Sequence, residues 1–355
     1  MKTKQRDTRY CGVDRERIAS AKPTISTVSL VHFRELITER YKVHVKKDVL
    51  KLEKPWTENP ILQQYKFTNV RREHDRQSRE LIRRVSTNPK LSLEEKIANT
   101  FLFRAWNNAD TFETFGGPWK LHVIYDPLTK ESARAVYREA MQEDPERLWF
   151  SSAYNQGGTK HAWKFPDGDG YERAYKESEA RKYPDWEPDI PLRVFHVGVW
   201  LGRDKVIQRI LAAKNQERCF EVIKSVRGFA DFLAYQVFVD LTYIEDFPFS
   251  ENEFVIAGPG CKRGMDRVFI DRGGMTYEEC LFWLRDRFDK LMSWLERKGH
   301  WPESDPWDPS ELFMDLESHD ACMNVMSLEN CFCEFSKYMK ALDGTGRPKV
   351  RYDGV

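Results

Sequence analysis

The sequence predicts a mostly α-helical protein. Apolar residues recur at helical spacing over long stretches, and two Ser/Thr-x-x-Glu boxes stand where such stretches begin. In a box of this kind the hydroxyl and the carboxylate each accept a backbone N–H that the first helical turn leaves without a partner. Glycines and prolines gather between the stretches, where helices end. We expect a bilobal helical core over residues 25–345.

The first half of this core contains three predicted helices and one irregular region. From Ser26 onward four apolar residues recur near a helical period, namely Val31, Phe33, Leu36 and Ile37. The capping box at residues 92–95 predicts a helix through Trp106, and another helix is predicted over residues 129–142. Residues 155–191 hold four glycines and four prolines, which favours a long irregular insertion.

The second half is more strongly helical. Residues 195–200 fit a short helix or a strand, because periodicity does not separate the two at this length. Residues 228–243 predict an apolar helix, and a second capping box at residues 276–279 predicts a long amphipathic helix that ends at Gly299. After a linker rich in Pro and Trp, the last helices are expected over about residues 310–341, followed by a tail at 346–355.

The composition excludes several classes of protein. With 355 residues, 41% of them hydrophobic, the chain is too apolar for a disordered tail and can bury a large core without disulfides. Its uncharged apolar runs are far shorter than the roughly 20 residues that cross a bilayer, and no secretory signal follows Met1. The seven cysteines form no Cys-x-x-Cys pair, so we expect free thiols, a reducing compartment and no structural zinc.

The formal net charge of +1 hides an uneven distribution. Residues 1–24 carry seven basic and three acidic residues, residues 65–84 carry the same numbers, and residues 301–330 carry eight acidic residues and no Lys or Arg. We expect residues 1–24 to form a flexible basic arm, with contact to a polyanion as the alternative. The acidic segment is expected to face away from a polyanion or to be solvated surface. A chain polarised in this way can bind a polyanion on one face.

An apolar run at residues 254–257 leads into Gly-Pro-Gly and then into Lys262 and Arg263. Glycines allow a ligand to approach the backbone closely, and the start of a helix offers free N–H groups to an anion. With a helix expected from Met265, Gly258, Gly260, Lys262 and Arg263 fit a phosphate cradle of the helix-hairpin-helix kind. The alternative is a plain Gly-Pro turn between two elements.

Two further segments carry groups that could perform chemistry. If residues 65–84 are helical, four arginines form one basic face, namely Arg72, Arg76, Arg79 and Arg83, and Asp75 could orient neighbouring arginines. At residues 327–338, Glu334 and Lys337 are neighbours on a helix, as are Cys333 and Lys337. A carboxylate beside an amine in a groove can act in acid–base catalysis. The alternatives are a solvated helix face for the arginines and a surface ion pair for Glu334.

Four segments, in this order, resemble a known family: FTNVRREHDR (67–76), GFADFLAYQVFVDLTY (228–243), EFVIAGPGCKRGM (253–265) and LENCFCEFSKY (328–338). They resemble the α-glutamyl/putrescinyl thymine pyrophosphorylase, or amino acid:DNA transferase, family. They also look like the helical domain of 5-hydroxymethyl-deoxyuridine DNA kinases. The resemblance implies a bilobal fold related to helix-hairpin-helix DNA glycosylases, with DNA between the two helical lobes.

The resemblance also implies a function in thymine hypermodification. Such an enzyme displaces phosphate or pyrophosphate from the 5-methylene carbon of a base in DNA with an amine, such as an amino acid or a polyamine. The amine is the co-substrate, and no cofactor is required. The expected partners are double-stranded DNA with a modified thymine, flipped out of the stack, and a 5-hydroxymethyl-dU DNA kinase. The expected location is the cytoplasm of a phage-infected cell, or the nucleus in a eukaryote.

The pattern and the resemblance together give the candidate site residues. The expected catalytic residues are Asp75, Glu329, Cys333, Glu334 and Lys337. The expected DNA- or phosphate-binding residues are Thr68, Asn69, Arg72, Arg76, Gly258, Gly260, Lys262 and Arg263. The expected substrate pocket contains Gln236, Asp240 and Asn330, and no metal ligand is expected. Either of two carboxylates, Glu334 or Asp75, would deprotonate the amine, and Cys333 would add to the ring or only pack.

One departure from the family keeps other functions open. Relatives more often have an acidic residue where this chain has Ser327, which puts catalytic activity in doubt if that acid takes part in the reaction. No GxxxxGK[ST] motif occurs, so the chain is not expected to be the kinase. The alternatives are a glycosylase that removes a modified base and a catalytically inactive reader of modified DNA.

Overall fold

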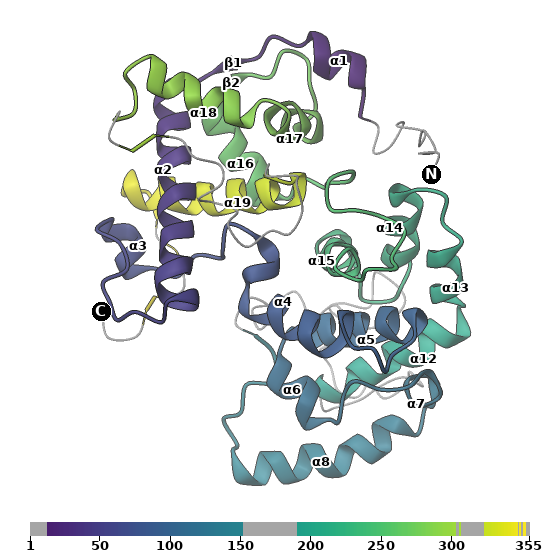
Figure 1. The fold of residues 1–355 in the computed structure, drawn as a ribbon. Helices are drawn as coiled ribbons and strands as arrows, with labels where there is room; N and C mark the ends of the chain where they lie inside the picture. Colours follow the sequence, from purple (N-terminus) through teal and green to yellow (C-terminus); the bar gives the residue numbers. More distant parts are fainter. Residues whose placement is uncertain are drawn as a thin grey trace. The chain divides into compact units, whose positions relative to one another are not determined.

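The computed structural model describes residues 13–151, 190–302, 305–306, 323–346, 348 and 351–352, and these are mostly α-helical, as predicted (Figure 1). Among these residues the only strands are β1 (Thr24–Ile25) and β2 (Phe269–Asp271), which pair antiparallel. The chain divides into two compact units. Unit 1 consists of Met1–Asp75 and Glu251–Val355, and unit 2 is Arg76–Ser250.

Unit 1 is organised around the long helix α19. Its helices are α1 (Arg15–Ser20), α2 (Thr27–His44), α3 (Pro60–Gln64), α16 (Pro259–Val268), α17 (Tyr277–Arg285), α18 (Phe288–Arg297) and α19 (Val325–Leu342). In Figure 1, α19 (yellow) runs across α2 and α16, and it packs against both as well as against α17. Phe332 of α19 stacks on Phe33 of α2, with ring centroids 4.3 Å apart.

The crossing of α16 and α19 is unusually close, because two glycines one turn apart on α16 face α19. A Cβ atom on Gly264 would lie 2.1 Å from the carbonyl oxygen of Phe332, and one on Gly260 would lie 2.5 Å from the Sγ atom of Cys333. Both distances are far inside van der Waals contact. Only residues without a side chain allow the two backbones to come this near.

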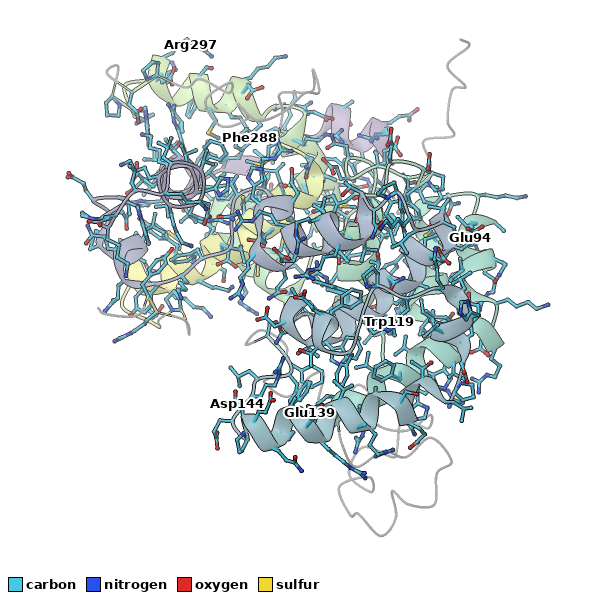
Figure 2. All side chains as sticks on the ribbon, turned by 60° about the horizontal axis from the view of Figure 1, so that its bottom comes forward. Glu94, Trp119, Glu139, Asp144, Phe288 and Arg297 are labelled. Carbon is cyan, nitrogen blue, oxygen red and sulfur yellow. The ribbon has the colours of Figure 1, made fainter. Side chains whose placement is uncertain are left out.

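Unit 2 surrounds an aromatic core. Its helices are α4 (Arg76–Leu81), α5 (Leu93–Trp106), α6 (Ala109–Thr114), α7 (Leu121–Tyr125), α8 (Thr129–Glu143), α12 (Phe195–Arg203), α13 (Val206–Leu211), α14 (Gln216–Lys224) and α15 (Asp231–Leu241). The fully buried ring of Trp106 contacts Phe112, Phe115, Phe195 and Trp119, the last of which is labelled in Figure 2. The burial of these large apolar rings contributes strongly to the stability of unit 2.

Most predicted helices are confirmed. Both capping boxes form, with Ser92 and Glu95 at the start of α5 and with Thr276 and Glu279 at the start of α17. The helix predicted over residues 129–142 is α8, and the one predicted over 228–243 is α15, which starts after Gly228 adopts a positive φ of 84°. Residues 195–200, for which helix and strand both remained open, belong to α12.

The single amphipathic helix predicted from residue 276 to Gly299 is wrong, because the segment forms two helices. The break lies at Asp286 and Arg287, where the φ and ψ angles of Arg287 are −125° and 6°. The break allows the two helices to pack against different elements: α17 packs against α19, whereas α18 packs against α2. The predicted end holds, since Gly299 adopts a positive φ of 70° after α18.

Two further expectations change with the tertiary contacts. The helix expected from Met265 begins already at Pro259, with Gly258 as its N-cap, so residues 258–264 are not a hairpin loop. Arg72, Arg76, Arg79 and Arg83 do not share one helix, because a 3-10 turn at Arg72–His74 ends in extended backbone at Asp75 before α4 begins. The chain passes from unit 1 to unit 2 at this point.

The basic arm expected over residues 1–24 does not include residues 13–24, because this part packs on unit 1. Helix α1 buries Ile18, the Asp14 backbone N–H donates to Glu279 at 2.9 Å, and β1 pairs with β2. Residues 1–12, residues 155–189 of the insertion expected at 155–191 and most of the acidic segment (303–304 and 307–322) lie outside the described residues. Of the expected tail, Tyr352 donates its N–H to the carbonyl oxygen of Gln64. No helix in the described ranges combines the length and apolar character that crossing a membrane requires.

We predict that Gly264→Ala destabilises unit 1 by about 3 kcal/mol or more, because a methyl group cannot fit against the backbone of Phe332 without separating α16 from α19. The free energy of unfolding in urea measures this effect. Gly346→Ala is the matched control, since its nearest atoms lie 3.7 Å from the added Cβ and its effect should be small. Equal stability of the two variants would contradict the close crossing.

Candidate functional site

Five of the predicted site residues lie along α19 in unit 1. These are Glu329, Asn330, Cys333, Glu334 and Lys337. The helix begins where Asn324 caps it by accepting the N–H of Ser327 at 2.7 Å. The predicted pair of Glu334 and Lys337 forms, with 2.7 Å between Oε1 and Nζ. Glu334 is 2% exposed, so this pair is not a freely solvated surface contact.

The segment before residue 75 is fixed to α19 by side-chain amides. Asn330 donates from Nδ2 to the Oγ1 of Thr68 at 3.0 Å and to the carbonyl oxygen of Asn69 at 3.1 Å. The N–H of Asn69 donates to the Oδ1 of Asp75 at 2.7 Å. The structure thus brings Thr68, Asn69, Asp75 and Asn330 together, although sequence reasoning had assigned them to three different roles.

Glu329 joins this segment to the start of α16. Its Oε2 lies 3.4 Å from the Nη1 of Arg72, and its Oε1 accepts the N–H of Gly258 at 3.3 Å. The positive end of α16 therefore faces a carboxylate of the chain itself. The predicted phosphate cradle at Gly258 already interacts with Glu329, and Gly260 faces Cys333. Lys262 and Arg263 lie exposed on α16.

Sequence reasoning missed Arg40, which organises the same segment from α2. It is 4% exposed and donates to the carbonyl oxygens of Thr68 (3.0 Å from Nε) and Asn69 (2.8 Å from Nη2). A signal was available: Arg40 lies three and four residues after the apolar positions Ile37 and Leu36, on the face predicted to be buried. A charged residue on such a face needs a buried polar partner.

Burial raises the pKa values of two carboxyl groups in this cluster, Asp75 and Glu329. Burial is the main cause at Asp75 and brings its pKa from 3.8 to about 6, although Asn69, Arg72 and Arg40 act in the opposite direction. The pKa of Glu329 is also raised by burial, against the opposing charge of Arg72. An acid with a pKa near 6 is poised for proton transfer close to neutral pH.

The chemistry of Cys333 does not match that of a thiolate nucleophile. Burial raises its pKa to about 11, and Glu334 and Glu329 act in the same direction, so the group is a neutral thiol near pH 7. Its sulfur packs against Gly260. Burial disfavours the charge on Lys337, but the pKa of this amine is raised because Glu334 outweighs burial. Lys337 is therefore a cation in the cluster.

The remaining predicted residues lie in unit 2. Arg76 lies 3.5 Å from Asp110 in an exposed ion pair. Asp240 is buried in α15 and forms a two-point ion pair with Arg104, whose Nη1 also donates to Asn107 at 2.5 Å. A carboxylate held in this way is typical of structural support. Gln236 lies one turn before Asp240 on α15.

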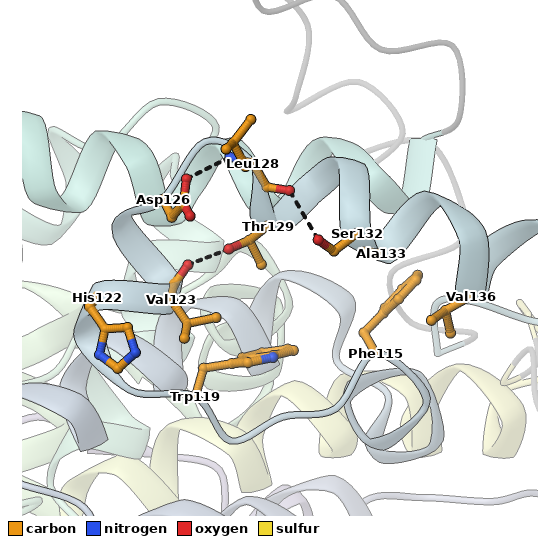
Figure 3. A pocket seen from close by; sticks show the side chains of 10 residues that line it. All are labelled: Phe115, Trp119, His122, Val123, Asp126, Leu128, Thr129, Ser132, Ala133 and Val136. Carbon is orange, nitrogen blue, oxygen red and sulfur yellow. Dashed lines mark hydrogen bonds between the residues drawn. The ribbon is translucent and has the colours of Figure 1, made fainter.

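A pocket of about 370 Å³ lies between α7 and α8 of unit 2 (Figure 3). The rings of Phe115 and Trp119 line it. Polar groups in its lining form hydrogen bonds with residues close by in the chain. Thr129 donates to the carbonyl oxygen of Val123 at 2.5 Å, and Asp126 accepts the N–H of Leu128 at 2.8 Å. We assign it no chemistry, since it lacks convergent polar groups. Within the described ranges no group of three His, Cys, Asp or Glu residues is placed to hold a metal.

Comparison with known proteins assigns the family. Residues 27–346 match the family described as 5-hmdU DNA kinase, helical domain. This chain belongs to that family. A 5-hmdU DNA kinase of Bacillus phage SP10 is 26% identical to it over 339 residues, which are 92% of this chain and 47% of that protein. The chain thus spans about half the length of that curated relative. The resemblance to the helical domain of 5-hydroxymethyl-deoxyuridine DNA kinases is confirmed, whereas the resemblance to the pyrophosphorylase family stays a prediction. No solved structure matches, so the likeness to helix-hairpin-helix DNA glycosylases also stays a prediction.

We predict that Asp75→Asn is more stable than the wild type above pH 6. The folded-state pKa of Asp75 lies above the unfolded value of 3.8, so folding becomes less favourable as pH rises from about 4 through about 6. The variant removes this loss, which amounts to up to about 3 kcal/mol, and the difference should vanish below pH 4. Urea unfolding across this range measures it. Asp271→Asn, at an exposed carboxylate, is the control. A pH-independent difference would contradict a raised pKa at Asp75.

Proposed function

We propose that this chain modifies DNA bases derived from 5-hydroxymethyluracil by exchanging a phosphate or pyrophosphate on the 5-methylene carbon for an amine. One observation carries the proposal: two carboxyl groups with raised pKa values, Asp75 and Glu329, lie in one cluster with the cations Arg72 and Lys337. The family match supports DNA containing 5-hmdU as the substrate class. A kinase that phosphorylates this base would supply the substrate.

In the proposed reaction the amine nitrogen forms a bond to the 5-methylene carbon, and the carbon–oxygen bond to the phosphate breaks. The proton of the amine passes to a carboxylate, and the leaving group departs as phosphate or pyrophosphate. Asp75 is better suited as the base than Glu334, since its pKa is about 6 and the carboxylate of Glu334 is held by Lys337. Arg72 and Lys337 would stabilise the charge of the leaving group.

The reacting base would be flipped out of the stack, because a 5-substituent inside a duplex cannot reach a buried cluster. Thr68, Asn69 and Asn330 are bonded to one another in the site, and a base edge would be recognised by exchange with these hydrogen bonds. In this proposal Cys333 packs against Gly260 and does not attack the ring, because a thiol with a pKa of about 11 is a weak nucleophile at neutral pH. A fold related to that of helix-hairpin-helix DNA glycosylases belongs to the same proposal.

Incubation with DNA that carries 5-pyrophosphoryloxymethyluracil and a mixture of amino acids and polyamines tests the reaction. We predict amine-linked nucleosides in the digest, identified by mass, and a kcat/KM that rises with pH through about 6 as Asp75 ionises. Asp75→Asn should lower kcat/KM by about 10²- to 10⁴-fold, whereas Asp271→Asn should not change it. The absence of amine-linked nucleosides with every amine would rule out the transfer.

A catalytically inactive reader of modified DNA is the second candidate. Ser327 favours it, because this residue is 1% exposed in the first turn of α19, at a position where the resemblance to the pyrophosphorylase family implies an acid. Such a reader would bind DNA without turnover, and Ser327→Asp would then restore it. The glycosylase alternative predicts free base and an abasic site in the same digest, so one experiment separates all three.

A further inference from the structure

A cluster of cations on unit 1 contains none of the candidate site residues considered above. Three lysines converge on the ring of Tyr352, with the Nζ atoms of Lys54, Lys66 and Lys47 at 5.2, 5.4 and 5.8 Å from its centroid. Two of them also lie within 6 Å of Trp56, Lys54 at 5.7 Å and Lys47 at 5.8 Å. Any two of these nitrogens are no further apart than the sum of their distances to Tyr352, about 11 Å.

The surface around these lysines is strongly basic. Residues 45–56, together with Lys66 and Arg351, carry six Lys or Arg and two Asp or Glu. Of the two acids, Asp48 faces His44 at 3.1 Å and Lys47 at 3.8 Å, and six cations against two acids leave this surface with a net positive charge. Like charges this close repel one another at a separation near the Debye length. A polyanion that spans several of them relieves this repulsion.

The aromatic rings hold the cations in place. The rings of Trp56 and Tyr352 contact each other edge to face, with centroids 5.4 Å apart, and the indole of Trp56 donates to the carbonyl oxygen of Leu52 at 2.8 Å. Tyr352 is itself fixed by its N–H, which donates to Gln64. A lysine stacked on a fixed ring loses less freedom when it binds an anion than one on an open surface.

The position of this basic surface along the chain points to DNA. Lys66 lies two residues before Thr68, which Asn330 holds in the candidate site. The basic surface and the site therefore belong to the same unit and are joined by one short stretch of chain. Exposed aliphatic side chains at Val49, Leu50 and Leu52 flank it.

We propose that Lys47, Lys54 and Lys66, arranged around Trp56 and Tyr352, bind the phosphodiester backbone of DNA beside the nucleotide that enters the candidate site. The inference rests on the proposed function in that DNA is the substrate. It adds a backbone-binding surface distinct from Arg72, Lys262 and Arg263. Because the contacts are to phosphates, the binding is independent of sequence and strongly dependent on salt.

The test measures binding of a fluorescently labelled, unmodified DNA duplex to the whole chain by anisotropy over a range of salt concentrations. The variant K47Q/K54Q/K66Q should bind at least about tenfold more weakly at low salt, and the slope of log affinity against log salt should fall by about 2 to 3. The variant K47R/K54R/K66R should bind like the wild type. The control K290Q/K298Q/K340Q removes three exposed lysines of unit 1 elsewhere and should leave the slope unchanged.

Several outcomes would overturn the inference. These are equal binding by the glutamine variant and the wild type, equal loss in the control, and binding to vesicles of anionic lipid in place of DNA. Competition by inorganic pyrophosphate with a salt slope near one would identify a site for a small anion instead. Failure of the proposed function looks different: the duplex would bind with the predicted slope, and no amine-linked nucleoside would form. In the active enzyme the glutamine variant should raise KM for DNA and leave kcat unchanged.

Discussion

The contact between Gly264 and the carbonyl of Phe332 determines the geometry of the candidate site. Since α16 and α19 touch at their backbones there, Glu329, one turn before Phe332, comes within hydrogen-bonding distance of the α16 N-cap at Gly258. The same closeness seats Cys333 on Gly260. A wider spacing would open the region around Cys333 to water and weaken the burial that raises the pKa of Glu329.

The segment at residues 67–75 has little regular structure, yet several side chains fix it. Asn330 from α19 and Arg40 from α2 together bind the carbonyl groups of Thr68 and Asn69, and Asp75 closes the turn on the Asn69 N–H. A buried polar network of this kind specifies one conformation only when its members are satisfied together. The functional groups of the site are therefore held by side-chain hydrogen bonds more than by secondary structure.

The sequence predicted what depends on neighbouring residues and failed where distant residues decide. The capping boxes at Ser92 and Thr276 were recognised because both partners lie within one turn. The sequence around Gly260 and Gly264 predicts a loop, since nothing local shows that α19 lies against these residues. The spacing of Arg72 and Arg76 fitted one helix, but a 3-10 turn and extended backbone at Asp75 come between them where the chain passes from one unit to the other.

Prediction of the site residues shows the same division. Glu334 and Lys337 pair as their spacing on one helix required, whereas the role of Arg40 depends on a segment almost thirty residues away in the chain. The four motif segments that carried the family resemblance are also divided by the fold. Asp75, Glu329 and Glu334 lie in unit 1, while Gln236 and Asp240 lie in unit 2.

The carboxyl group of Asp75 lowers the stability of the fold when it is ionised, and the same property suits it to proton transfer. Burial makes the ionised form of Asp75 unfavourable, and the nearby charges of Arg72 and Arg40 offset only part of that penalty. A structural carboxylate would be paired fully, as Asp240 is by Arg104. The contrast between these two acids in one chain favours the proposed proton transfer at Asp75 and structural support at Asp240, because only an acid whose charge is incompletely stabilised gains from accepting a proton.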